Sequence, residues 1–243
     1  KQKRKVEDYQ YRIRENEKFD VKEFDYESRE GFYSKGSFSN FLNNEKIDFQ
    51  LGYEVSEISG FASSIAGDFN GQNISRKLGS YDAYGSSEVN LTPKFSFRPG
   101  IRVMFSSQFK TEQALSFSVK YSFTEDFDAR FILGTSPRIP SYDELYSYFV
   151  DVNHNVQGNS ELNTEKGTSA FIHLRKKHNF SKFKSESKLS AWLIDVSDRI
   201  ELIIVNDAPL AYKFMNIDQY KSRGISYNNA FRYENFNANV GLT

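Results

Sequence analysis

The sequence predicts an all-β fold, a transmembrane antiparallel up-and-down β-barrel, and three observations support this prediction. Apolar and polar residues alternate along segments of about ten residues, the length that tilted membrane strands require. Aromatic residues make up 16% of the 243 residues, although mean hydropathy is −0.63 and 26% of residues are charged. A barrel accounts for this pairing, because one strand face meets lipid while the other face and the loops are wet. Short and long connections also alternate, as they do in bacterial barrels.

The alternation is clearest in residues 115–123, where every odd position is apolar or aromatic and every even position is serine or lysine. Such a segment places all its apolar side chains on one face of a strand. The interleaved polar residues predict that the second face is hydrated, either by bulk water around a soluble β-sandwich or by the lumen of a barrel. The same alternation recurs in residues 47–55, 95–106, 225–233 and 236–242. Pro99 interrupts the second of these segments and predicts a bulge there.

The connections between these segments differ in length, and they predict about eleven strands. Bacterial outer-membrane barrels have short periplasmic turns and long extracellular loops. We expect short turns near residues 43–46, 92–94, 124–128, 179–185 and 234–235, and longer excursions near 60–77, 136–162 and 206–211.

One of the longer excursions carries strong local signals. Pro140 disfavours helical backbone in the residue before it, so the preceding strand should end here. Ser141 and Glu144 have the spacing of a capping box, which predicts a short helical turn. Gly158 followed by Asn159 predicts a tight turn before the next strand.

These signals form two motifs that resemble the late barrel region of TonB-dependent outer-membrane receptors. In that family a strand rising to the cell surface ends in a pattern close to RxPSxxELY, and the following strand returns through GNxxLxxE. Ser160 and Thr164 stand where the family usually has proline. The first motif here consists of Arg138, Pro140, Ser141, Glu144, Leu145 and Tyr146, and the second of Gly158, Asn159, Leu162 and Glu165.

The resemblance implies that residues 1–243 are part of a single receptor barrel domain, about half of a 22-stranded barrel, with no plug domain, no signal peptide and no final strand. It implies an outer-membrane location and active import of a scarce nutrient, such as a ferric siderophore, heme, cobalamin or an oligomeric nutrient. The implied partners are outer-membrane lipid, the small nutrient ligand, and the TonB energy-transducing complex, which would act through the missing plug. A surface lipoprotein or other assembly partner is also compatible with a receptor-like barrel in a larger outer-membrane assembly. A passive porin and a soluble β-rich binding module stay open as alternatives.

Within this interpretation, the candidate ligand contacts lie in the extracellular loop that covers residues 141–159. Aromatic side chains there would give a large contact area at small entropic cost. The candidates are Tyr142, Tyr146, Tyr148 and His154.

Composition and spacing argue against other classes of protein. The formal charge is +0, from 32 basic and 32 acidic residues, so no nucleic-acid partner is expected. The three histidines lack the spacing of a closed metal site, there is no G-x-S-x-G motif, and there is no cysteine. We therefore expect neither an enzyme nor a metal or cofactor. No apolar run approaches the roughly 20 residues of a membrane helix.

Overall fold

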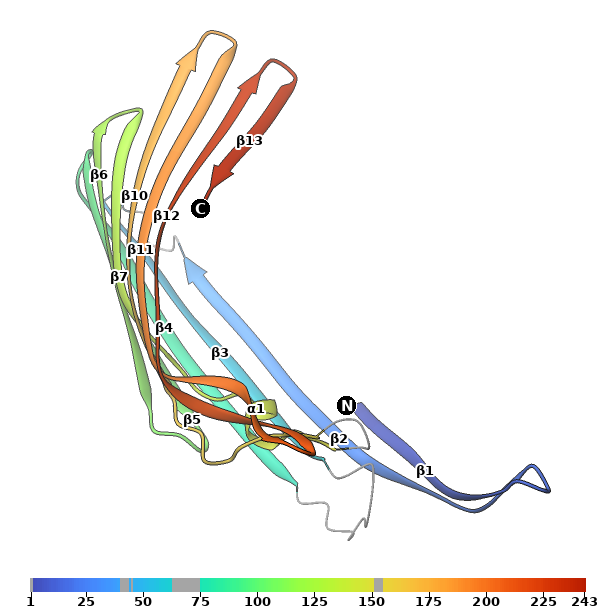
Figure 1. Ribbon diagram of the computed structural model, residues 1–243. Coiled ribbons are helices and arrows are strands. Elements are labelled where there is room, and N and C mark those ends of the chain that lie inside the picture. The colour runs from blue at the N-terminus through green and yellow to red at the C-terminus, as the bar shows by residue number, and fades with distance from the viewer. Residues whose placement is uncertain (1, 40–43, 45, 63–74, 151–154) are drawn as a thin grey trace.

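A computed structural model describes residues 2–39, 44, 46–62, 75–150 and 155–243. Nearly all of the described chain is β-strand (Figure 1), in agreement with the predicted fold class. The long strands are β1 (Gln2–Arg12), β2 (Glu17–Ser39), β3 (Ile47–Ala62), β4 (Arg76–Thr92), β5 (Phe95–Ser106), β6 (Glu112–Thr124), β7 (Phe127–Arg138), β10 (Glu165–Phe180), β11 (Phe183–Asp207), β12 (Leu210–Tyr233) and β13 (Phe236–Leu242). Between β7 and β10 lie the helix α1 (Tyr142–Tyr146) and the short strands β8 (Tyr148–Val150) and β9 (Asn155–Gln157).

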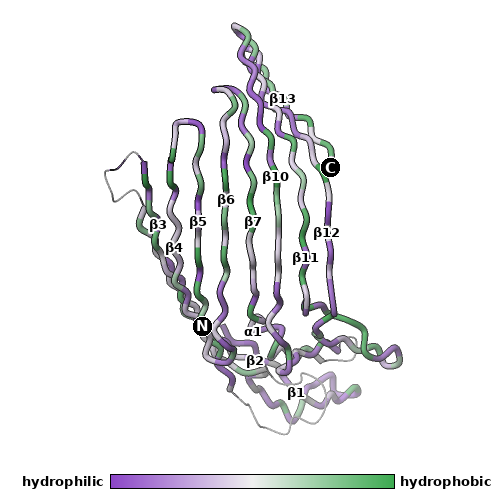
Figure 2. Tube along the Cα trace, turned by 90° about the vertical axis from the view of Figure 1, so that its left-hand side faces the viewer, coloured by the Kyte–Doolittle hydropathy of each residue, from purple (hydrophilic) through white to green (hydrophobic). Residues whose placement is uncertain are grey.

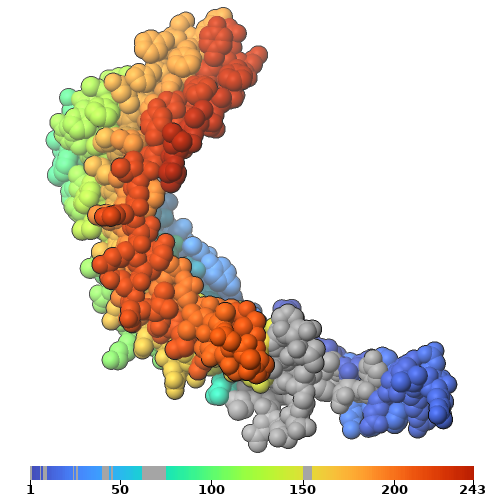
Figure 3. All heavy atoms as spheres, viewed as in Figure 1, coloured from blue at the N-terminus to red at the C-terminus, as the bar shows by residue number. Residues whose placement is uncertain are grey.

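The strands form one 13-stranded sheet in which each long strand pairs with the next long strand along the chain. All of these pairings are antiparallel, and β9 alone among the described strands pairs in parallel, with the loop end of β12. When the two three-residue strands β8 and β9 are set aside, eleven strands remain, as the sequence predicts. The sheet is an up-and-down meander that is curved, with a concave and a convex side (Figures 1 and 3). We refer to this curved sheet as the wall.

Hydrophobic and hydrophilic residues alternate along the strands (Figure 2), and the strand register assigns them to the two faces of the sheet. On the concave face, Leu78 of β4 packs against the loop between β7 and β10. Since side chains alternate along a strand, Tyr81 faces outward on the convex side. The strand register extends this outward face to Leu115 and Phe117 of β6, which are 52% and 43% exposed. An apolar face of this kind would be unfavourable in water, and a lipid environment removes that cost.

The concave face carries ion pairs between neighbouring strands. Arg102 lies between Glu54 and Asp82, with its Nη2 2.8 Å from Glu54 Oε2 and its Nε 2.9 Å from Asp82 Oδ2. Arg175 donates in the same way to Asp128 on the neighbouring strand β7, at 2.8 Å. These ion pairs neutralise charges that line a barrel lumen.

The short turns lie together at one end of the sheet, at the top of Figure 1. Four of the predicted turns are two-residue connections between antiparallel strands, which confirms their positions. Two of the four residues of the predicted turn near 43–46, and most of the excursion near 60–77, lie outside the described residues. The four described turns are Pro93–Lys94, Glu125–Asp126, Ser181–Lys182 and Glu234–Asn235.

Two local predictions are wrong. The register between β5 and β6 runs unbroken through Pro99, which pairs with Phe117, so the missing N–H of proline interrupts the ladder without inserting a bulge. The excursion near 206–211 is instead a two-residue turn, Ala208–Pro209, at the tip of a long β11–β12 hairpin. Residues 202–205, one leucine followed by three β-branched residues, favour extended backbone and prolong the strand into the loop region.

Candidate functional site

The candidate site is the loop between β7 and β10, at the end of the wall opposite the short turns (Figure 1). The loop begins at Pro140, which is fully buried, and α1 follows directly. The predicted capping box is confirmed: the Ser141 hydroxyl accepts a hydrogen bond from the Glu144 N–H at 3.3 Å, and Glu144 Oε2 accepts one from the Ser141 N–H at 2.7 Å. Both interactions satisfy N–H groups that a helix start leaves without partners.

Arg138 fastens the two ends of this loop. Its guanidinium donates to Glu144 Oε2 at 2.9 Å, at the start of the loop, and to Glu165 Oε2 at 2.7 Å, at the start of β10. The second oxygen of Glu165 accepts from the backbone N–H of Ile200 at 2.7 Å. A planar guanidinium can hold two carboxylates at once in this way. The first residue of one motif is therefore joined to the last residue of the other.

The electrostatics of Glu144 follow from this geometry. Burial raises the pKa of the Glu144 carboxyl, but hydrogen bonds and charge from Arg138, together with hydrogen bonds from the N–H and hydroxyl of Ser141, lower it by more. The net pKa lies below its ordinary value, because the partners favour the charged form more than burial disfavours it. The loop is thus fastened by an ionised carboxylate at neutral pH.

A small apolar core lies under the loop. Leu145 and Leu162 are each 3% exposed, and Ile200 of β11 is 6% exposed. Four partly buried side chains surround them, namely Leu78, Phe109, Tyr146 and Phe214. The core therefore joins the loop to β4, β11 and β12.

The turn at Gly158 and Asn159 closes the loop against α1. A Cβ atom at position 158 would lie 2.7 Å from the backbone carbonyl of Leu145, so only glycine allows this close approach. The N–H of Asn159 donates to the carbonyl of Glu144 at 2.8 Å, and its side-chain amide donates to the carbonyl of Phe214 at 3.0 Å. These contacts give the motif residues a structural role in holding the loop.

The loop also reaches across the concave face to β2. Arg29 donates to Asp143 at 3.1 Å, and its guanidinium lies 5.4 Å from the centroid of the Tyr142 ring. Such a contact combines an ion pair with a cation–π interaction. Since Arg138 and Arg29 hold opposite sides of the loop, the loop spans the concave side of the wall at its loop end.

The four predicted ligand contacts occupy different environments. Tyr142 is 5% exposed, and burial raises the pKa of its phenol. Tyr146 is half-buried, and its hydroxyl donates to Gln108 Oε1. Tyr148 is 39% exposed. His154 lies outside the described residues. A ligand-contact role for these four residues stays a prediction.

Several residues of the site carry no signal in the sequence. Arg29 is separated from Asp143 by 114 positions, and Asn163 forms reciprocal hydrogen bonds with Asn216, 53 positions away, at 2.8 and 3.1 Å. No local pattern marks such pairs, because they arise only when the wall curves and the loop closes on it. Ile200 lies in an alternating strand that the pattern does not single out.

In the part of the chain that the structure describes, no three or more His, Asp and Glu side chains are grouped so that they could hold a metal ion. The same residues contain no helix with the length and apolar character needed to span a membrane.

The fold and the loop define a class of protein, the membrane-spanning β-barrel with long loops at one end and short turns at the other. The family model described as the β-barrel of TonB-dependent receptor-like proteins matches residues 4–243. The chain belongs to this family, which confirms the resemblance drawn from the two motifs. Its members are outer-membrane transport receptors rather than enzymes.

Solved structures of such receptors share the fold. The siderophore receptor PirA from Pseudomonas aeruginosa has a TM-score of 0.65 and 13% identity over 89% of this chain, which covers 41% of PirA. The ferric enterobactin receptor PfeA from the same organism, a mutant in complex with enterobactin, has a TM-score of 0.65 and 15% identity over 86% of this chain and 34% of its own. The hemophore receptor HasR from Serratia marcescens, in complex with its hemophore HasA and heme, has a TM-score of 0.67 and 11% identity over 91% of this chain and 43% of its own.

The chain thus spans less than half the length of each of these receptors. Its eleven long strands make up half of a 22-stranded receptor barrel. A comparison with curated protein sequences gave no match.

Proposed function

We propose that the intact protein imports a scarce nutrient across the outer membrane with energy from the TonB complex. The nutrients that we consider are a ferric siderophore, heme, cobalamin and an oligomeric nutrient. Membership of the receptor family supports this proposal, as do the similar structures, which are siderophore, enterobactin and hemophore receptors. TonB coupling would act through a plug domain, which we place in another part of the intact protein.

The observation that carries the proposal is the described part of the loop, residues 139–150 and 155–164. It lies on the concave side at the loop end, where a ligand arriving from outside the cell would meet the barrel. Arg138 and Arg29 hold it at both sides, so its aromatic side chains are presented on a rigid support. We propose that Tyr142, Tyr146, Tyr148 and His154 contact the ligand, with Tyr148 the most exposed of the three that the structure describes.

Uptake by whole cells tests this function. A strain producing the full-length receptor is supplied with labelled ferric enterobactin, ferric hydroxamate, heme or cyanocobalamin, and a TonB-deficient strain is the control. We expect uptake of one ligand class, abolished in the TonB-deficient strain. Uptake that does not change without TonB would refute active transport and indicate a passive pore.

The role of Tyr148 is tested separately in the purified full-length receptor. Tyr148→Ala should weaken binding of the transported ligand about tenfold, since an aromatic contact of this kind contributes on the order of 1–2 kcal/mol. Phe183→Ala is a matched control, because Phe183 is 38% exposed but lies beside a short turn at the opposite end. Equal affinity of the Tyr148 variant and the wild type would remove Tyr148 from the site.

A second candidate function rests on the tip of the β11–β12 hairpin. Leu202, Ile204 and Leu210 are 42%, 53% and 46% exposed there, at the loop end of the wall. Exposed aliphatic groups on a loop are typical of a protein-binding surface. We propose as the alternative a receptor-like barrel that docks a surface lipoprotein or other assembly partner at this tip. Leu202→Asp with Ile204→Asp should then remove a co-purifying partner while small-ligand binding stays unchanged, and an unchanged set of co-purifying proteins would exclude the alternative.

A further inference from the structure

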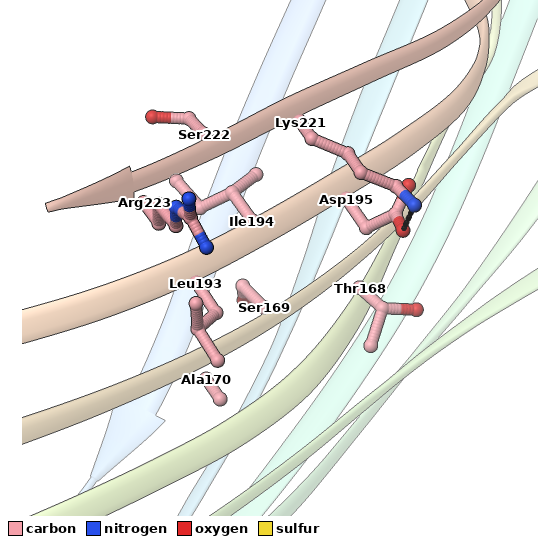
Figure 4. Close-up of a pocket in the computed structure, with 9 residues that line it drawn as sticks. All are labelled: Thr168, Ser169, Ala170, Leu193, Ile194, Asp195, Lys221, Ser222 and Arg223. Carbon is pink, nitrogen blue, oxygen red and sulfur yellow. Dashed lines mark ion pairs between the residues drawn. The ribbon is translucent and has the colours of Figure 1, made fainter.

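Two adjoining cavities lie on the outer surface of β10, β11 and β12, away from the loop site. The first, about 630 Å³, has a mixed lining in which the polar and charged residues Thr168, Asp195, Lys221 and Arg223 lie beside apolar ones (Figure 4). The second, about 470 Å³, is lined almost entirely by apolar residues. Ala170, Leu193 and Arg223 line both cavities, so the two lie side by side.

The strand register shows that these cavities face outward. Phe117 on the outward face of β6 pairs with Leu133, which pairs with Ala170 of β10. Ala170 pairs with Leu193, and Leu193 pairs with Arg223 of β12. Because paired residues in a sheet project on the same side, this row belongs to the convex face, which meets the membrane in a barrel.

The convex face changes from apolar to polar at the row of Ala170, Leu193 and Arg223. On the side towards the short turns, the next outward row holds Ile172, Ala191 and Ile225. The small side chains of Ala170 and Ala191 leave a groove in the apolar cavity. Larger side chains also line this cavity, among them that of Ile172, which is 46% exposed. The cavity's volume of about 470 Å³ and its apolar lining suit an acyl chain.

On the side towards the loops, the next outward row holds Thr168, Asp195 and Lys221. Lys221 Nζ lies 3.5 Å from Asp195 Oδ2, and Figure 4 shows this ion pair beside Thr168. Among the residues that the structure describes, no carboxylate pairs with Arg223. Its guanidinium extends from β12 towards β11 (Figure 4). A cation at the edge of an apolar surface favours an anionic partner.

The position of Arg223 along β12 matches one membrane boundary. Outward positions between Arg223 and Tyr233, which lies beside a short turn, are apolar or aromatic except for Asn229. Ten residues of strand extend about 33 Å, and a tilt of 35–45° projects them to roughly 25 Å, the height of the apolar band of a barrel. Because the long loops are extracellular, Arg223 lies at the outer-leaflet boundary.

We propose that the two cavities bind a phosphate-bearing, acylated lipid of the outer leaflet. The guanidinium of Arg223 and the ammonium of Lys221 donate to the phosphate, and an acyl chain lies in the groove across Ala170 and Ala191. The arrangement fits a lipid rather than a free anion, because the cavity that holds Arg223 and Lys221 adjoins the apolar one. The site lies on the wall and does not depend on which nutrient the receptor transports.

Native mass spectrometry of the detergent-purified full-length receptor tests the site. The probes are diphosphorylated lipid A, the same lipid without its phosphates, and inorganic phosphate. We expect wild type to retain the diphosphorylated lipid at least five times better than the dephosphorylated form, and Arg223→Gln to remove that preference. Lys176→Gln is the matched control, since Lys176 is an exposed outward cation nearer the short turns, in the same strand as Ala170.

The groove is tested by Ala191→Phe, which fills the apolar cavity and leaves both cations in place. Retention of the diphosphorylated lipid should fall at least threefold, while the heat-modifiable gel mobility of the barrel shows that it has folded. Equal retention of the two lipid forms, equal retention by wild type and Arg223→Gln, or displacement of the lipid by millimolar inorganic phosphate would each overturn the proposal.

Discussion

Replacing Arg138 by methionine should release the loop from the wall without unfolding the barrel. The substitution keeps much of the aliphatic volume but removes the hydrogen bonds to Glu144 and Glu165, whose side chains are 16% and 12% exposed. Removing one partner of a buried ion pair destabilises a protein by about 3–5 kcal/mol. The Arg138 side chain is 42% exposed, so solvent screening reduces this to about 2 kcal/mol.

A change of about 2 kcal/mol raises the population of the open loop roughly 30-fold. Hydrogen exchange in the full-length receptor measures this population through the N–H groups of Leu145, Gly158 and Asn159, which donate to carbonyls within the loop region. These amides should exchange roughly 30-fold faster in Arg138→Met, while amides at the β6–β7 turn keep their wild-type rates.

Arg98→Met is the matched control for this experiment. Arg98 is 43% exposed and lies on the same concave face, but its nearest carboxylate contact, with Glu88, is 3.9 Å long. Its replacement should leave exchange in the loop unchanged. Wild-type protection of the loop amides in Arg138→Met would refute the reasoning, and so would an equal loss of protection throughout the barrel.

Three further predictions concern the same loop. The Glu144 carboxyl has a lowered pKa in the folded loop, so its stabilisation is complete above the unfolded pKa of about 4.3 and is lost as pH falls through the lower folded value. Exchange corrected for intrinsic rate should therefore accelerate below about pH 4. Because Glu165 accepts from the same guanidinium, Glu144→Gln should reduce this pH dependence, and Glu144→Gln combined with Glu165→Gln should abolish it. Gly158→Ala should destabilise the loop by about 1–3 kcal/mol, because the new Cβ meets backbone at 2.7 Å, whereas Gly31→Ala, with its nearest atom at 3.7 Å, should have no effect on loop exchange. Leu162→Ala should lower the free energy needed to open the loop by about 2–5 kcal/mol, because Leu162 is buried. Limited proteolysis of the loop measures this opening, and an unchanged cleavage rate would show that Leu162 does not support the loop.

The sequence by itself determined the features that depend on residues close together along the chain. Alternation over residues 115–123 predicts strand β6 and the face that it buries in lipid, because side chains of a strand point to opposite sides in turn. The capping box at Ser141 and Glu144 predicts helix α1, because four consecutive residues are enough to form it. The two motifs were also sufficient to predict the receptor family that the match over residues 4–243 shows.

The tertiary structure alone decided how the loop is held and where the outer wall accepts a lipid. Arg29 reaches Asp143 across 114 positions, and Ile200 joins the loop core from β11, only because the curved sheet brings these strands to one side of the loop. The row of Ala170, Leu193 and Arg223 likewise comes from the register of three strands. Such contacts depend on strand register and on the curvature of the whole sheet. The alternation of apolar and polar residues repeats every two positions, so it does not show which residues from distant parts of the chain will lie together.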